Sequence, residues 1–194
     1  IKNEKIYFNN SLGDISSVDI NNGNLIWQIP TQSSLAFDTG FFLKTSDIVV
    51  EKNALFFSNN QNEFFSLDAQ TGNLNWKQEI NSNLRPVIIN DLIFTVTLEG
   101  YLVIVEKNSG NIVRSNYLLN QFKEKKRPDI EPTGFIIGNK NIYLSNNIGR
   151  LSVIDIATGV TKNILKIDNK KISRPAIFNK NLYIISNNSI IKLD

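Results

Sequence analysis

Short apolar runs, many of them alternating with polar residues, follow one another along the whole chain and are separated by turn-forming residues. Lys5–Phe8 and Asn141–Leu144 are two such runs, and Gly, Asn and Asp cluster between the runs. Runs of this length with these boundaries are typical of β-strands. No stretch shows a helical period of useful length. The pattern therefore predicts an all-β protein.

The predicted strands belong to a repeat that occurs five times. Each copy ends a strand on an acidic residue, and the five segments align without gaps on Asp19, Asp68, Glu106, Asp155 and Asp194. Successive acids are 49, 38, 49 and 39 positions apart. The base period is thus 38–39 residues, and alternate units carry about eleven extra ones.

Each unit has the same order of elements. A large apolar residue stands twelve positions before the acid, in a first hairpin strand: Tyr7, Phe56, Phe94, Tyr143 or Leu182. The acid then opens a turn that closes on Gly, where a carboxylate can accept backbone N–H groups and Gly supplies positive φ. The residues with these turn and packing roles are Asp19, Gly23, Trp27, Asp68, Gly72, Trp76, Glu106, Gly110, Asp155 and Gly159. A further strand precedes the hairpin, beginning at Pro86 or Pro175. Four short strands in about 40 residues predict one blade of a β-propeller.

Two segments resemble the PQQ repeat, in which a strand ends in Leu-Asp, a Thr-Gly turn follows, and the next strand ends in Trp. They are Leu67–Trp76 and Gly149–Gly159. The resemblance implies about five four-stranded PQQ-like units, the first and last incomplete, in a single propeller region over residues 1–194 that is part of an eight-bladed propeller. In this family the closing Trp packs between neighbouring blades. Arg114 and Asn163 replace it in later units, so we expect the third and fourth blades to dock differently.

The two ends of the chain cannot complete one blade together. The first unit has a blade's last three strands and the last unit a blade's first three, which is more than one four-stranded blade can hold. The chain also begins at Ile1 without Met, which suggests a fragment or a processed product. We therefore expect an open arc that pairs with a second copy or with a missing N-terminal half, because open sheet edges favour association.

Composition excludes several kinds of chemistry. The chain has no His and no Cys, which removes a Ser-His-Asp triad, a thiolate nucleophile and Cys-ligated metal. No apolar run is long enough for a transmembrane helix. The net charge is only +3 and basic residues are dispersed, so nucleic acid is not an expected partner. We interpret the repeated carboxylates as turn caps, and we expect no catalytic residue, cofactor or metal site.

PQQ-repeat propellers include quinoprotein dehydrogenases and non-enzymatic, BamB-like proteins that bind other proteins. The end of the chain, Arg174–Asp194, resembles the C-terminus of the BamB-like group. The resemblance implies a non-enzymatic protein-binding scaffold in the periplasm, held at the outer membrane by an anchor outside this chain, with a β-barrel assembly complex as its partner. Two alternatives remain open: a fragment of a PQQ-dependent quinoprotein dehydrogenase, and a structural fragment without activity of its own.

Two insertions carry the candidate partner-binding residues. The first, Pro30–Leu43, places five apolar residues outside the blade pattern: Leu35, Phe37, Phe41, Phe42 and Leu43. They form either a partner site or a flap over the edge of their own blade. The second runs from about Leu118 to Glu131 and holds the only dense basic run: Lys123, Lys125, Lys126 and Arg127. It is interpreted as a solvated loop, or as a contact for an acidic partner or anionic lipid head groups.

Overall fold

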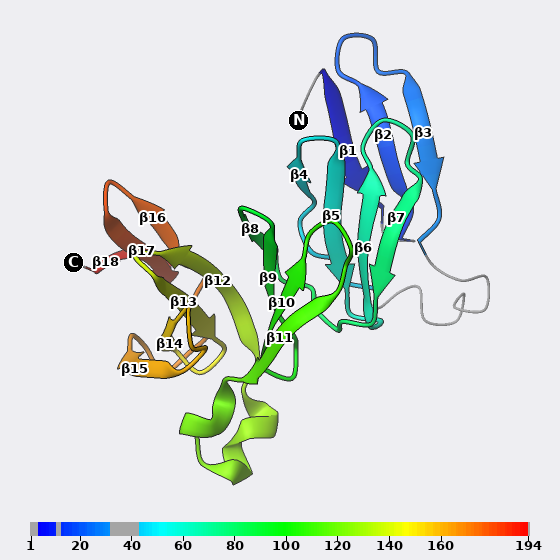
Figure 1. The fold of residues 1–194 in the computed structure, drawn as a ribbon. Coiled ribbons are helices and arrows are strands. Elements are labelled where there is room, and N and C mark those ends of the chain that lie inside the picture. The colour runs from blue at the N-terminus through cyan, green and yellow to red at the C-terminus, as the bar shows by residue number, and fades with distance from the viewer. Residues whose placement is uncertain (1–3, 11–12, 32–42, 194) are drawn as a thin grey trace. The chain divides into compact units, whose positions relative to one another are not determined.

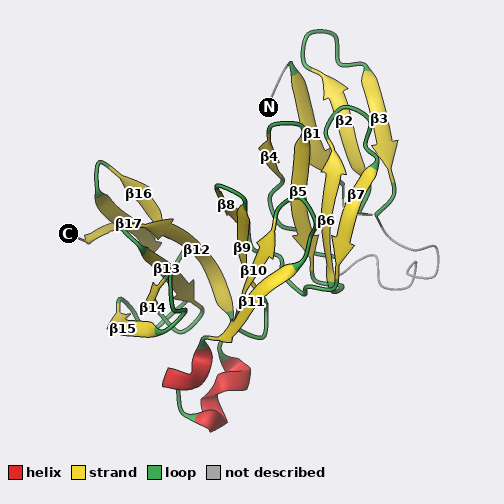
Figure 2. Cartoon of the chain, viewed as in Figure 1, coloured by secondary structure: helices red, strands yellow, loops and turns green. Residues whose placement is uncertain are grey.

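The computed structural model describes residues 4–10, 13–31 and 43–193. In this part of the chain the strands form five antiparallel sheets, each a simple meander in which consecutive strands are neighbours (Figure 1). The sheets hold three, four, four, four and three strands. Figure 2 shows that strands joined by loops and turns make up most of the described part of the chain. The predicted series of propeller blades, incomplete at both ends, is therefore confirmed.

The strand boundaries follow the repeat. The first two sheets contain β1 (Lys5–Asn9), β2 (Ile15–Asp19) and β3 (Leu25–Ile29), then β4 (Val49–Glu51), β5 (Ala54–Asn59), β6 (Glu63–Asp68) and β7 (Leu74–Gln78). The third contains β8 (Val87–Ile89), β9 (Leu92–Val96), β10 (Tyr101–Glu106) and β11 (Ile112–Tyr117). The last two contain β12 (Pro132–Gly138), β13 (Asn141–Asn146), β14 (Arg150–Asp155) and β15 (Thr161–Lys166), then β16 (Ala176–Phe178), β17 (Asn181–Ser186) and β18 (Ser189–Leu193).

A β-bulge recurs at one position in the first four sheets. The register between the strand that ends on the acid and the strand after the turn slips there by one residue. In the second sheet, for example, Ser66 pairs with Trp76 and Leu67 with Leu74. The extra, unpaired residues are Ile26, Asn75, Val113 and Lys162. A bulge increases the local twist and re-aims side chains, so these four residues leave the normal alternation of the strand.

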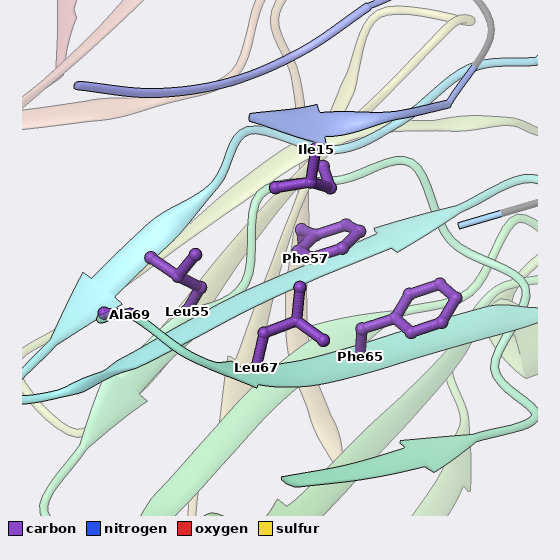
Figure 3. Packing of buried hydrophobic residues seen from close by; sticks show 6 residues of the cluster. All are labelled: Ile15, Leu55, Phe57, Phe65, Leu67 and Ala69. Atoms are coloured by element: carbon purple, nitrogen blue, oxygen red, sulfur yellow. The ribbon is translucent and has the colours of Figure 1, made fainter. Parts of the chain in front are cut away.

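By its internal contacts the chain divides into two units. The first is Ile1–Pro86 with the turn Glu106–Asn111, and the second is Val87–Val105 with Ile112–Asp194. The first unit has a core in which Ile15 of β2 faces Phe57 of β5 (Figure 3). That core also includes Leu55, Phe65, Leu67 and Ala69. The second unit has a core cluster of Leu151, Ile172, Leu182 and Ile184.

The second insertion contains short helices. It folds into two 3₁₀ helices, η2 (Leu119–Gln121) and η3 (Glu124–Asp129). Leu118 before η2, Leu119 at its start and Ile130 after η3 are buried, so apolar residues at both ends anchor the insertion within the second unit. Within the described residues, no helix is long and apolar enough to cross a membrane.

Candidate functional site

The carboxylates that recur in the sequence each cap their own turn. Asp68 Oδ1 accepts the backbone N–H groups of Gln70 and Thr71 at 2.9 and 2.8 Å, and Asp19, Glu106 and Asp155 repeat the arrangement. Hydrogen bonds from Ser109 lower the pKa of Glu106, and the Lys162 ammonium lowers that of Asp155. Among the residues described here, no group of three or more Asp or Glu side chains could hold a metal ion.

A tryptophan joins one blade to the turn of the next. Trp27 Nε1 donates to the carbonyl of Ala69, the residue that follows the capping Asp68, at 3.3 Å. Trp76 Nε1 donates in the same way to the carbonyl of Lys107, which follows Glu106, at 2.9 Å. The indole N–H of a buried tryptophan usually has such a hydrogen-bond acceptor. We call this contact, from the last strand of one blade to the turn of the next, the blade joint.

The closing glycine of the turn makes room for the joint. A Cβ on Gly110 would lie 2.6 Å from Cδ2 of Trp76, and a Cβ on Gly72 would lie 2.9 Å from Cε3 of Trp27. Both glycines also have positive φ, 75° and 78°. Gly23 has the same backbone conformation, φ 73°, but nothing lies within 4 Å of its added Cβ. The repeated Gly therefore provides the positive φ of the turn in each unit. It also leaves room for a blade joint where a side chain of the preceding blade covers the turn.

Arg114 makes the third blade joint with a different side chain. Its Nη2 donates to the carbonyl of Ile156 at 2.7 Å, and its Nη1 donates to Ala157. Ile156 follows Asp155, so it is the repeat equivalent of Ala69 and Lys107. Arginine thus replaces tryptophan as donor while the acceptor stays the same. Asn163, at the next equivalent position, bonds within its own strand to the N–H of Ile164.

A polar groove lies beside the second joint, within the first unit. It has a volume of about 460 Å³, and its lining includes Glu51, Ser66, Asn75 and Lys107. The Lys107 ammonium lies 3.3 Å from the Glu51 carboxylate, and the Lys107 side chain is only 9% exposed. Asn75 Nδ2 donates to Ser66 Oγ at 3.2 Å. Polar groups of this groove therefore pair with one another in at least two places.

An apolar groove lies beside the third joint, within the second unit. It has a volume of about 440 Å³. The residues that line it are Ile89, Asn90, Leu92, Phe94, Ile104, Val113, Arg114, Ile156 and Ala157. We call it the Val113 groove, after the bulged residue of β11 that borders it. Val113 is 60% exposed, and its neighbour Ile112 is 49% exposed.

The two grooves occupy the same place in consecutive repeats. Counted from the capping acids Asp68 and Glu106, Ile89 replaces Glu51, Ile104 replaces Ser66, and Val113 replaces Asn75. Counted from the acid of the following turn, Ile156 replaces Lys107. Sequence reasoning missed both grooves, although a comparison of the repeats column by column would have shown this change from polar to apolar residues.

The predicted partner-binding residues are only partly described by the structure. Leu35, Phe37, Phe41 and Phe42 lie outside the described residues, and Leu43 is half-buried. The basic run is split. Lys123, Lys125 and Lys126 are exposed, whereas Arg127 donates from Nε to the Phe122 carbonyl at 3.0 Å and from Nη2 to the Asn120 carbonyl at 3.2 Å. Arg127 therefore holds the insertion in shape, and the three lysines form what we call the lysine face.

Comparison with known proteins agrees with the repeat. The sequence profile described as outer membrane protein assembly factor BamB matches residues 1–116. A search of curated proteins found no match. Among solved structures, the chain resembles BamB from Moraxella catarrhalis with a TM-score of 0.62 and 13% identity, over 99% of this chain and 70% of that one.

Other propellers give similar scores. The computationally designed Ika8 protein matches with a TM-score of 0.72 and 11% identity, over 99% of this chain and 55% of that one. The Cps50 (Swd1) β-propeller domain of Myceliophteria thermophila matches with a TM-score of 0.71 and 12% identity, over 94% of this chain and 58% of that one. The chain thus spans little more than half the length of these two propellers. At such identities the structural matches establish the fold.

Proposed function

Because the chain belongs to the PQQ-repeat family of the outer membrane protein assembly factor BamB, we propose that it is a non-enzymatic scaffold that binds proteins during the assembly of outer-membrane β-barrels. The observation that supports this most directly is the family match over residues 1–116, which takes in the first two blade joints and most of the third sheet. The proposed location is the periplasmic face of the outer membrane.

Residue chemistry is consistent with a scaffold. The sequence has neither His nor Cys, the side chains that most often supply a general base or a strong nucleophile. The repeated Asp and Glu side chains point their oxygens at backbone N–H groups of their own turns. The grooves beside the blade joints are the described features best suited to recognition, because a groove with a few polar groups at its edge is the usual form of a binding site.

Direct binding to a purified outer-membrane β-barrel assembly complex tests the proposal. The chain would be immobilised and the detergent-solubilised complex passed over it, with an unrelated propeller of similar charge as the control. Saturable binding to the chain alone is the expected result. The absence of binding at micromolar concentrations of the complex would contradict the proposed function.

An enzymatic assay tests the quinoprotein alternative, which the PQQ-like repeats suggest. The chain would be incubated with pyrroloquinoline quinone, Ca²⁺, a primary alcohol and a redox dye. We expect no alcohol-dependent dye reduction. Sustained turnover that requires both quinone and alcohol would show that the protein is an enzyme and would overturn the proposal.

A further inference from the structure

The Val113 groove exposes apolar surface that the blade architecture does not require. The equivalent groove in the preceding blade is lined by an ion pair and amides. One blade earlier still, the Tyr7 side chain reaches the equivalent turn, and its hydroxyl donates to the Ala69 carbonyl at 3.0 Å. Exposed apolar surface is unfavourable in water, and contiguous apolar patches on proteins commonly mark binding sites. The change from Glu51, Ser66 and Asn75 to apolar residues between these two consecutive blades therefore favours a ligand with an apolar side chain.

The charges around the groove favour an acidic ligand. Arg114 lines the groove, and its Nη groups donate to backbone carbonyls. These hydrogen bonds therefore do not pair the positive charge of the guanidinium with a carboxylate. The chain that leaves β11 continues through η2 to η3, and the lysine face of Lys123, Lys125 and Lys126 lies at the start of η3. None of these three lysines forms an ion pair with a described residue. The apolar groove and the lysine face both belong to the second unit.

The distance between the two features sets the spacing of the ligand. From Val113 to the end of β11 at Tyr117 the strand advances about 13 Å at roughly 3.3 Å per residue. From Tyr117 to the lysines the chain passes through η2 and the first residues of η3, which add about one to two turns of roughly 6 Å each. An extended peptide covers this span of roughly 19–25 Å in about six to eight residues.

We propose that the Val113 groove binds an extended segment of a partner protein. The segment inserts one large apolar side chain between Val113, Ile104 and Ile156 and carries acidic residues about six to eight positions away, opposite the lysine face. This inference rests on the proposed function and names the kind of partner segment the scaffold recognises. Burial of the apolar side chain supplies affinity, and the lysines select the charge of the segment and speed its association.

Peptide binding to the whole chain tests the inference. The probe is a fluorescein-labelled, Ser/Thr-rich peptide with one Phe and, about six positions later, a run of Glu. One control peptide has Ser in place of Phe, and the other has Gln in place of Glu. We expect saturable binding by fluorescence anisotropy only for the first peptide, with an affinity that falls as salt rises.

Two variants locate the binding on the chain. V113N installs the residue type that the preceding blade has at this position, so the fold has a precedent for it, and we expect affinity to fall at least about tenfold. The matched control is V160N, because Val160 is 59% exposed in the same unit and does not line the groove. Triple replacement of the lysine face by Glu should also weaken binding by about tenfold or more at low salt. Circular dichroism verifies that each variant is folded.

The outcomes separate this inference from the proposed function. Absence of peptide binding, or equal binding by V113N and the unaltered chain, would overturn the groove assignment. Binding of the lysine face to phosphatidylglycerol vesicles but not to the peptide would assign the lysines to lipid and would also overturn it. If V113N still binds the assembly complex but the unaltered chain fails to bind the peptide, the proposed function stands and the groove inference falls. If the unaltered chain does not bind the complex, the proposed function itself fails.

Discussion

Replacing Gly110 by alanine measures how much the second blade joint contributes to stability. Gly110 closes the turn that Trp76 covers, and a methyl group there would lie 2.6 Å from Cδ2 and 2.8 Å from Cγ of that indole. The ring cannot move away easily, because Phe64 packs edge-to-face against it at 5.6 Å between centroids and Nε1 is bonded to the Lys107 carbonyl. Gly23 is the matched control, with nearly the same φ and open space around it.

The expected magnitudes follow from two terms. Alanine in the left-handed conformation costs about 1–2 kcal/mol at either site. Overpacking against Trp76 adds about 1–3 kcal/mol at Gly110 only. We therefore expect unfolding free energies to fall by about 1–2 kcal/mol in Gly23→Ala and about 2–5 kcal/mol in Gly110→Ala. The difference corresponds to a Tm gap of roughly 2–12 °C for a chain of this size.

Urea denaturation followed by tryptophan fluorescence provides the assay, since Trp27 and Trp76 are the two tryptophans of the chain. In a Trp76→Leu background, followed by circular dichroism, the cost of Gly110→Ala should fall to that of Gly23→Ala, because the ring that the methyl group meets is gone. Equal losses for the two single variants, or an unchanged Gly110→Ala cost without the indole, would refute the packing argument.

Three further predictions concern other described contacts. Arg114→Ala should lower the unfolding free energy by about 1–3 kcal/mol, because the Ile156 and Ala157 carbonyls lose their two donors. Arg114→Trp should lower the unfolding free energy less. An equal loss for both variants in denaturant titration would contradict the equivalence of the two donors. The folded-state pKa of Asp155 is depressed by Lys162, so its stabilisation is present above the ordinary carboxyl pKa of about 4 and is lost as the pH falls below it. Asp155→Asn should therefore have a lower unfolding free energy than the unaltered chain at neutral pH, and that free energy should fall less as the pH is lowered. An equally steep fall in the variant would refute this. Asn179 and Lys180 form the two-residue turn between β16 and β17, with φ of 47° and 65°. Because glycine adopts positive φ without strain, Lys180→Gly should raise the unfolding free energy by up to about 1 kcal/mol. A lower Tm than that of the unaltered chain would count against that reasoning.

Much of the fold could be predicted because each blade is specified locally. The acids at Asp19, Asp68, Glu106 and Asp155 and the turn glycines after them predict the register of every unit, and the observed strands follow it. The first strands of the third and fifth sheets begin at Val87 and Ala176, one residue after the prolines that we expected to start them. The shift has a simple cause, since proline has no N–H to contribute to a ladder.

The grooves and the third joint could not be predicted in the same way. The lining of the Val113 groove depends on a one-residue slip between Ile104 and Val105 and on Ile156 from the turn of the following blade. Neither is visible in the alternation of apolar and polar residues along one strand. Arg114 departs from the repeat pattern, and only the geometry shows that its guanidinium reaches the carbonyl that an indole reaches elsewhere.

The blade joint has consequences for how such a chain can change by mutation. Its acceptor is a main-chain oxygen, which no amino-acid substitution can remove, and only the donor is encoded by a side chain. Tryptophan and arginine both fulfil the donor role here, although they differ in charge and shape. A duplicated unit can thus drift at the donor position and still dock on its neighbour. Units from unrelated propellers of this type could be recombined if one side-chain N–H group of each unit reaches the turn carbonyl of the next. The groove beside the joint then remains free to acquire a new binding specificity.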